Sequence, residues 1–409
     1  MPLHAALPGP NITMRIALPL LLALAVSACS QTRAPDALPP LGQADFASYQ
    51  QQTRHWLQQH RQFVTATPQD ELAYNSPQQW QPAGAPRGAI LLVHGLGDSP
   101  YSFTDLGPAL AESGYLVRSV LLPGHGSKPA DLIAAQYQDW QTLVAQQTAL
   151  LQREGLPVYL GGFSTGANLV MLQAMAEPRV AGVLLFSPAF KSDSRIDWLA
   201  PWVAPIKPWL RQPDEGVQQT AVRYLNVPTN GFGLFYRSSS AVLSALAAKP
   251  YDKPAFMVLA ERDSVVDVGE ARRLFQQRFT HPASRLVWYG RQAGNGQDPR
   301  QLWQSDYLPQ QRISQFSHMS VLFSPANPLY GQDGSLRMCR NGQEDAEVAA
   351  CQRGATVWYS DWGYREPGKV HARLTFNPYF NWQLGVMRSV LQTAQPAPHP
   401  AVAASSSSH

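Results

Sequence analysis

The stretch LGGFSTGANLV, residues 160–170, constrains the fold of this chain more than any other segment. Ser164 stands between two glycines at two-residue spacing, after the apolar segment 156–161 and before the helix-like segment 167–176. Glycines at these positions are needed where a strand turns sharply into a helix, because side chains there would collide and the serine is held in a strained conformation. The stretch therefore predicts a strand, a tight turn and a helix.

The bare pattern Gly-x-Ser-x-Gly also arises by chance, so an ordinary serine in a glycine-rich turn is the alternative interpretation. The flanking strand and helix favour a nucleophile at Ser164. A helix that begins there directs its first N–H groups at developing negative charge. The backbone N–H of Thr165 is therefore a candidate donor to an oxyanion.

Apolar β-branched runs alternate with amphipathic stretches through most of the chain. This order predicts an α/β fold with a mostly parallel sheet and helices on both faces. No internal repeat is visible. The expected strands are 89–93, 116–121, 158–160, 180–186, 255–259 and 285–289, and the clearest helices are 137–152 and 270–279.

A serine nucleophile needs a base, usually a histidine that a carboxylate orients. Asp263 follows the expected strand 255–259, at the carboxyl edge where ligands of parallel sheets gather. His318 follows the last expected strand, which completes the order Ser, Asp, His of this architecture. Asp267 lies four residues after Asp263 and is a competing carboxylate.

The segment ILLVHGLGDSP, residues 90–100, predicts a strand that enters a glycine-containing turn. The backbone N–H of Leu96 in this turn is the second candidate oxyanion donor, beside that of Thr165. Each such donor typically contributes about 3 to 4 kcal/mol in the transition state.

Other titratable residues have plainer predicted roles. His94 and His125 lie in turn sequences and are expected to bond backbone groups. His281 and His371 have no motif around them and are predicted to lie at the surface or in loops. Glu261 is expected to point away from Asp263, because neighbouring side chains of a strand face opposite ways.

Five motifs, taken in order, resemble the landmarks of α/β-hydrolases: HGLGDSP, LLPGHGSKPADL followed by DW, GGFSTG, ERDSVV and SHM. They are most similar to those of the bacterial carboxylesterase and monoacylglycerol lipase group. The resemblance covers about 85–320 and resumes near 378–392. It implies the α/β-hydrolase fold, Ser164 as nucleophile, Asp263 as orienting acid and His318 as base, without cofactor or metal.

The amino-terminal sequence has the form of a secretory signal, with Arg15 before the apolar run 16–26. That run is too short to span a bilayer, which needs about 20 apolar residues. The residues Val26-Ser27-Ala28-Cys29 resemble the lipobox of bacterial lipoproteins, which implies a lipid on Cys29; cleavage after Ala28 without lipid is the alternative. We expect a signal peptide at 1–28, with Met14 as an alternative start.

The expected organisation continues with a proline-rich tether at 29–45, a hydrolase domain at 46–392 and a disordered tail at 393–409. Within the domain, about 190–250 carries three tryptophans among prolines. It is predicted to be a cap that offers apolar walls to a substrate or a membrane surface. A helical insert whose tryptophans touch no ligand is the alternative.

About fifty residues separate His318 from the last helix, where relatives have few. This insert, about 323–375, contains Cys339 and Cys351. In an exported chain a disulfide between them is expected. A zinc site is the weaker alternative, since no histidine stands at ligand spacing.

Composition excludes some classes of function. With 409 residues, 44% of them hydrophobic, the chain can bury a large core. A net charge of +4 without a basic block gives no footprint for nucleic acid. We expect a monomeric, lipid-anchored serine esterase of the bacterial envelope, at the outer membrane or periplasm, acting on esters with apolar acyl groups. A peptidase or thioesterase on the same residues, and a non-catalytic binding lipoprotein, are the alternatives.

Overall fold

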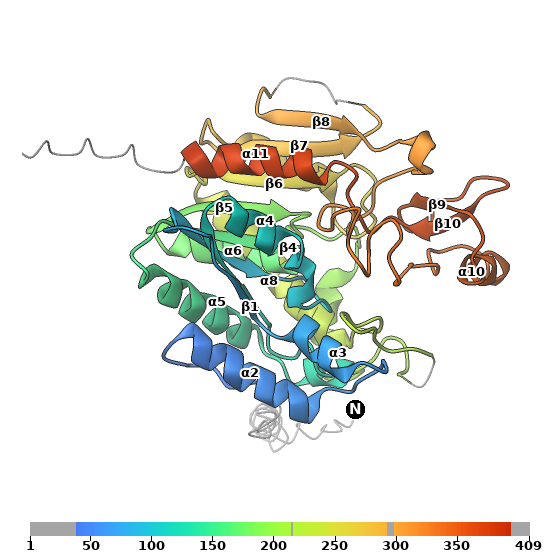
Figure 1. Cartoon of the computed structure of the whole chain (residues 1–409), viewed down its shortest axis with the longest axis horizontal. Helices are drawn as coiled ribbons and strands as arrows, with labels where there is room; N and C mark the ends of the chain where they lie inside the picture. The colour runs from blue at the N-terminus through green and yellow to red at the C-terminus, as the bar shows by residue number, and fades with distance from the viewer. Residues whose placement is uncertain (1–37, 214–215, 293–297, 394–409) are drawn as a thin grey trace, which may run out of the picture. The chain divides into compact units, whose positions relative to one another are not determined.

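An eight-stranded sheet in the order β1-β3-β2-β4-β5-β6-β7-β8 forms the frame of the protein (Figure 1). The computed structural model describes residues 38–213, 216–292 and 298–393, so the predicted signal peptide, Cys29 and the tail lie outside the described residues. Only β1 is antiparallel to its neighbour in this sheet. The strands are β1 Gln78–Trp80, β2 Gly88–Val93, β3 Tyr115–Val120, β4 Val158–Phe163, β5 Val180–Phe186, β6 Ala255–Ala260, β7 Arg285–Gly290 and β8 Gln301–Ser305.

Helices cover both faces of this sheet, as the alternating sequence pattern predicts. Successive side chains of a strand point to opposite faces. Leu91 of β2 accordingly joins one buried cluster with residues of α5, α6, α8 and α9, and Leu92 joins another with residues of α4 and α11. The topology is that of the α/β-hydrolase fold. The α-helices are α2 Phe46–His60, α3 Pro68–Asn75, α4 Leu106–Glu112, α5 Tyr137–Gln152, α6 Thr165–Ala176, α7 Ala200–Val203, α8 Thr229–Ala248, α9 Val268–Arg278, α10 Asp345–Gln352 and α11 Phe380–Thr393.

Several elements lie outside the predicted list. The edge strand β8, QLWQS, is polar and half-exposed, so it lacks the apolar run that marks a buried strand. Four short 3₁₀ helices also occur in the described residues: Pro100–Phe103, Pro129–Ile133, Asp197–Leu199 and Pro309–Gln311. Within the described ranges, no helix has both the length and the hydropathy to cross a bilayer.

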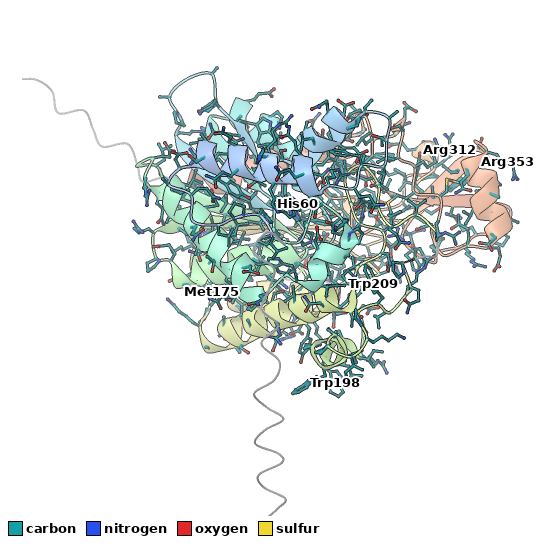
Figure 2. All side chains as sticks on the ribbon, turned by 90° about the horizontal axis from the view of Figure 1, so that it is seen from below. His60, Met175, Trp198, Trp209, Arg312 and Arg353 are labelled. Carbon is teal, nitrogen blue, oxygen red and sulfur yellow. A yellow bond between two sulfur atoms is a disulfide. The ribbon has the colours of Figure 1, made fainter. Side chains whose placement is uncertain are left out.

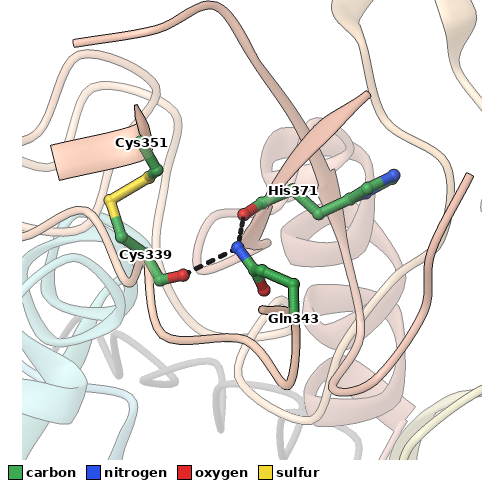
Figure 3. The surroundings of a disulfide bond; sticks show 4 residues. All are labelled: Cys339, Gln343, Cys351 and His371. Carbon is green, nitrogen blue, oxygen red and sulfur yellow. Dashed lines mark hydrogen bonds between the residues drawn. A yellow bond between two sulfur atoms is a disulfide. The ribbon is translucent and has the colours of Figure 1, made fainter. Parts of the chain in front are cut away.

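The insert after His318 carries α10 and a parallel strand pair, β9 Val357–Ser360 with β10 Val370–Arg373. The predicted disulfide is confirmed: Cys339 and Cys351 are bonded, with their Cα atoms 5.6 Å apart (Figure 3). Gln343 Nε2 donates to the carbonyls of Cys339 and His371 and so ties the disulfide to β10. The prediction of a surface position for His371 is wrong, because β10 buries this side chain beside Glu366.

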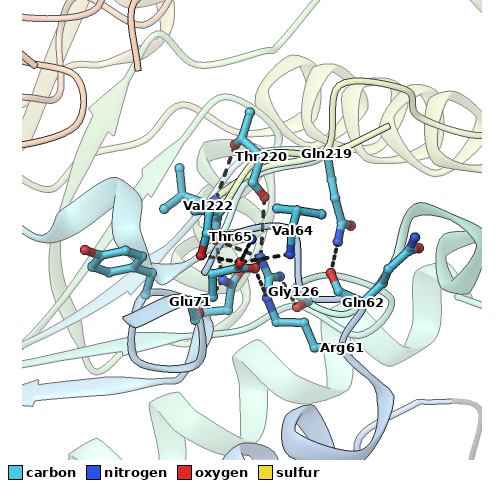
Figure 4. A network of polar contacts seen from close by, with 12 residues as sticks. Arg61, Gln62, Val64, Thr65, Glu71, Gly126, Gln219, Thr220 and Val222 are labelled. Atoms are coloured by element: carbon cyan, nitrogen blue, oxygen red, sulfur yellow. Dashed lines mark hydrogen bonds and ion pairs between the residues drawn. The ribbon is translucent and has the colours of Figure 1, made fainter. Parts of the chain in front are cut away.

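A buried ion pair joins the amino-terminal helices to the base of the cap segment (Figure 4). Arg61, which ends α2, donates to Glu71 of α3 at 2.6 Å and to the backbone carbonyls of Gly126 and Ala221. Burial disfavours a charged Glu71, but hydrogen bonds from Thr65 and Arg61 outweigh it and hold the pKa of Glu71 below its usual value of 4.5.

We predict that Glu71→Gln lowers the free energy of unfolding by about 3 kcal/mol, because it leaves a buried guanidinium without its counter-charge. Chemical denaturation at neutral pH measures the loss. In the parent protein this contribution should fall as the pH drops below 4.5, since the folded state holds the carboxylate more acidic than the unfolded chain does. The control is Glu177→Gln in the exposed pair with Arg179, which should cost much less.

Candidate active site

Ser164 lies at a sharp turn between β4 and α6, as the sequence predicts. Its backbone has φ 53° and ψ −118°, a strained conformation for a residue with a side chain. A Cβ on Gly162 would lie 2.5 Å from backbone atoms of Gly166, and one on Gly166 would lie 2.1 Å from the carbonyl oxygen of Val93. Only glycine fits at either position, so the two glycines are needed to bring the helix this close to the sheet.

The two candidate oxyanion donors flank this serine. Thr165 is the first residue of α6, where N–H groups have no partner within the helix. Leu96 belongs to the loop after β2, and a Cβ on its neighbour Gly95 would lie 3.1 Å from the Cβ of Ser164. The loop that carries Leu96 therefore passes directly beside the serine. The donor roles of Leu96 and Thr165 stay predictions.

Asp263 and His318 are brought together from segments 55 residues apart. His318 Nδ1 lies 2.6 Å from Asp263 Oδ2. The other carboxylate oxygen accepts hydrogen bonds from the backbone N–H groups of Val265 and Val266. These bonds orient the carboxylate toward the ring, which keeps the proton of a neutral imidazole on Nδ1 and leaves Nε2 as the basic nitrogen.

Three contacts place His318 at the same end of the sheet as Ser164. The ring of Phe163, the residue before Ser164, lies 4.9 Å from the His318 ring between centroids. Ser187, which follows β5, donates its hydroxyl to the His318 carbonyl at 3.1 Å. The carbonyl of Phe186, the last residue of β5, accepts from the N–H of Ser164. A hydrogen bond from Ser164 Oγ to His318 Nε2 stays a prediction, and such bonds often tighten only with substrate.

The competing carboxylate has a different role in this structure. Asp267 caps α9 by accepting from the N–H of Glu270, and it pairs with Lys191 at 2.7 Å. Glu261 lies in the turn after β6 rather than on the strand, and its carboxylate accepts from the N–H of Arg291. Of these three carboxylates, only Asp263 contacts His318.

His94 and His125 form hydrogen bonds with backbone groups of the loop that carries Leu96, in agreement with their predicted structural roles. His94 Nδ1 lies 2.8 Å from the carbonyl oxygen of Gly95, and His94 Nε2 accepts from the N–H of Leu122. His125 Nε2 accepts from the N–H of Gly97. Burial lowers the pKa of His94 to about 4, so its ring is neutral at pH 7 and can accept at Nε2.

The segment between β5 and β6 presents apolar side chains outward. Trp198 and Trp202 are 50% and 72% exposed, and Ile206 is 86% exposed. Figure 2 shows Trp198 at the outer edge of this segment. Exposed apolar side chains of this kind suit a contact with an apolar surface, and the role of the segment as a cap stays a prediction. The more buried part of the segment, α8, packs on α6 and so reaches the core.

A charged pair lies at the loop beside Ser164. Arg223 of the cap segment has its Nε 3.5 Å from Asp98 Oδ1, in the loop that carries Leu96. The same guanidinium contacts the sulfur of Met319, next to His318. The sequence does not indicate this pairing, because it depends on three segments that meet only in the folded chain.

Comparison with known proteins identifies the family of this chain. The family model Hydrolase_4, described as serine aminopeptidase, S33, matches residues 84–291. The chain belongs to this family. The match spans just over half of the chain and includes Ser164 and Asp263, but it ends before His318. Family and fold make this protein a serine hydrolase of the α/β-hydrolase class.

Individual relatives are lipolytic enzymes by name. The chain is 28% identical to a thermostable monoacylglycerol lipase of Bacillus sp. over 46% of its own length and 75% of that protein. It is 30% identical to human monoglyceride lipase over 27% of its own length and 37% of that protein. A monoacylglycerol lipase structure from Paleococcus ferrophilus shows 19% identity and a TM-score of 0.42, over 52% of this chain and 87% of that one.

We predict that Asp263→Asn lowers kcat about 10⁴-fold, because an amide favours the wrong tautomer and does not stabilise the imidazolium. Steady-state hydrolysis of a chromogenic ester measures the effect. Asp267→Asn is the matched control four residues away and should keep kcat, although it weakens a helix cap and an exposed ion pair. The reverse ranking of the two variants would assign the acid to Asp267.

Proposed function

We propose that this protein is a serine esterase that hydrolyses carboxylic esters with apolar acyl groups, such as short and medium fatty esters or monoacylglycerols. The observation that carries the proposal is the 2.6 Å contact of His318 with Asp263 at the end of the sheet where Ser164 lies in its strained turn. This is the arrangement that activates a serine hydroxyl for acyl transfer.

In the proposed reaction Ser164 Oγ attacks the ester carbonyl carbon while His318 Nε2 takes the hydroxyl proton. The N–H groups of Leu96 and Thr165 bind the oxyanion of the tetrahedral intermediate. The intermediate expels the alcohol, which receives the proton from His318, and an acyl-enzyme on Ser164 remains. Water, activated by His318, then releases the acid. Asp263 stays ionised and stabilises the imidazolium.

Two observations support esters over amides. The relatives that match are monoacylglycerol lipases by name. The carboxylate of Asp98, in the loop that carries Leu96, is paired with Arg223, so it is not free to bind the amino group of a peptide. The exposed apolar side chains of the cap segment add support for an apolar substrate. A peptidase or thioesterase uses the same three residues and is the second candidate, favoured by the name of the family model.

We predict that the protein hydrolyses p-nitrophenyl esters and that Ser164→Ala lowers kcat at least about 10³-fold. A series from two to sixteen acyl carbons defines the chain length, and an aminoacyl p-nitroanilide tests the peptidase alternative. Labelling with a fluorophosphonate probe is the control for an intact nucleophile. A folded protein that resists the probe and hydrolyses none of these substrates would instead be a binding protein.

We also propose that the protein is a lipoprotein of the bacterial envelope, anchored through Cys29. The support is the sequence Val26-Ser27-Ala28-Cys29 after a short apolar run. Several acyl chains at one end of a protein hold it firmly at a membrane. An anchored enzyme with apolar residues on its cap would act on lipids at the membrane surface.

We predict that the protein sediments with membranes after expression in a bacterial host and that Cys29→Ala moves it to the soluble fraction. Metabolic labelling with an alkyne fatty acid should mark the parent protein and not the variant. Ser30→Ala is the matched control, because it changes the adjacent residue and keeps the lipid acceptor. Equal labelling of the Cys29→Ala variant would contradict the anchor and leave the esterase proposal untouched.

A further inference from the structure

Ser187 has an unusual conformation for its place in the core. It follows β5, is fully buried, and has φ 41°, one of three positive values among the described non-glycine residues. A serine in this region costs free energy that a glycine would avoid. A hydrogen bond of its side chain offsets part of this cost, because the hydroxyl donates to the backbone carbonyl of His318 at 3.1 Å. Its own N–H donates to the carbonyl of Val258 in β6.

Ser317 ties the other side of the same backbone to the insert. Its hydroxyl donates to the carbonyl of Leu374 at 2.5 Å, just after β10. Leu374 in turn donates its N–H to Ser360, the last residue of β9. Ser317 is completely buried, so no water competes for this bond. Ser187 thus holds the His318 carbonyl from the core, and Ser317, the residue before His318, is held by the insert.

Backbone pairing extends this attachment along the segment that carries His318. Ser314 donates its N–H to Tyr359 of β9 at 2.8 Å, and Tyr359 donates to the carbonyl of Arg312 at 2.7 Å. Beyond His318, Phe323 forms a bridge with Phe376. The insert therefore pairs with this segment before the histidine, and the bridge between Phe323 and Phe376 joins the two ends of the insert, so its strands support the segment that carries His318.

We propose that Ser187 and Ser317 are positioning residues for His318, and that the insert takes part in catalysis through Ser317. The inference rests on the proposed function, because it assigns His318 as the base. A general base must stay within hydrogen-bond reach of both its carboxylate and its nucleophile. A displacement of about 1 Å can reduce the rate about 10²-fold. Two buried hydroxyls, one bonded to the His318 carbonyl and one to the insert, limit that displacement.

The test compares Ser187→Ala and Ser317→Ala with the parent protein by ester hydrolysis. We expect kcat to fall about 10- to 100-fold in each variant while KM changes little, because substrate contacts are kept and the base is misplaced. Labelling by fluorophosphonate should slow by a similar factor. The matched control is Ser239→Ala, which also removes a buried hydroxyl bonded to a backbone carbonyl, that of Phe190. It should keep kcat.

A further variant separates positioning from folding. Ser187→Gly relieves the positive φ, so it should unfold at a higher temperature than Ser187→Ala and still share its low kcat. Parent-like kcat in folded Ser187→Ala or Ser187→Gly protein overturns the role of Ser187, and parent-like kcat in Ser317→Ala overturns the role of the insert. Either result, together with an inactive Ser164→Ala variant, leaves the esterase proposal standing. Activity that survives Ser164→Ala would instead refute the proposed function.

Discussion

The close approach of α6 to the end of β2 is the constraint on which the rest of the site depends. Gly166 packs so near the Val93 carbonyl that a single added carbon would overlap it. This contact allows β4 to turn into α6 within one residue, and that residue is Ser164. The strain at Ser164 is thus maintained by the packing of a central helix on a central strand, which the whole sheet stabilises. Ser164 is therefore held in place by two buried elements of the core.

Local patterns in the sequence were sufficient to predict this part of the molecule. Buried parallel strands are continuous apolar runs, so six strands can be predicted from short stretches of sequence. The two glycines around Ser164 likewise predict the turn that holds the serine. The edge strand β8 could not be predicted in this way, because its residues are polar and half-exposed. His371 was misplaced for a related reason. Its burial depends on β9 and α10, which carry no strong pattern of their own.

The same distinction separates the members of the candidate site. The position of Asp263 just after a strand favours it over Asp267 as the acid, and in the structure Asp267 caps a helix instead. The sequence does not indicate the roles of Ser187, Arg223 and Ser317, because their contacts join residues between 57 and 131 positions apart. The conformation of Ser187 has no signal in the sequence either. A serine after a strand is common, and its positive φ appears only in the folded chain.

The members of the site differ in how they are supported, and this difference explains why the insert matters. Ser164 and Asp263 lie within the part of the chain that the family model matches, on the turns that follow β4 and β6. His318 lies beyond it, on a segment with no helix or strand of its own between 312 and 323. A segment of that kind keeps a fixed position only if neighbours satisfy its backbone groups. Here the insert supplies many of those partners, and the Cys339–Cys351 disulfide limits how far the insert itself can open. The disulfide therefore stabilises the position of His318 indirectly, which gives the chain a physical reason to keep about fifty residues that its fold does not require.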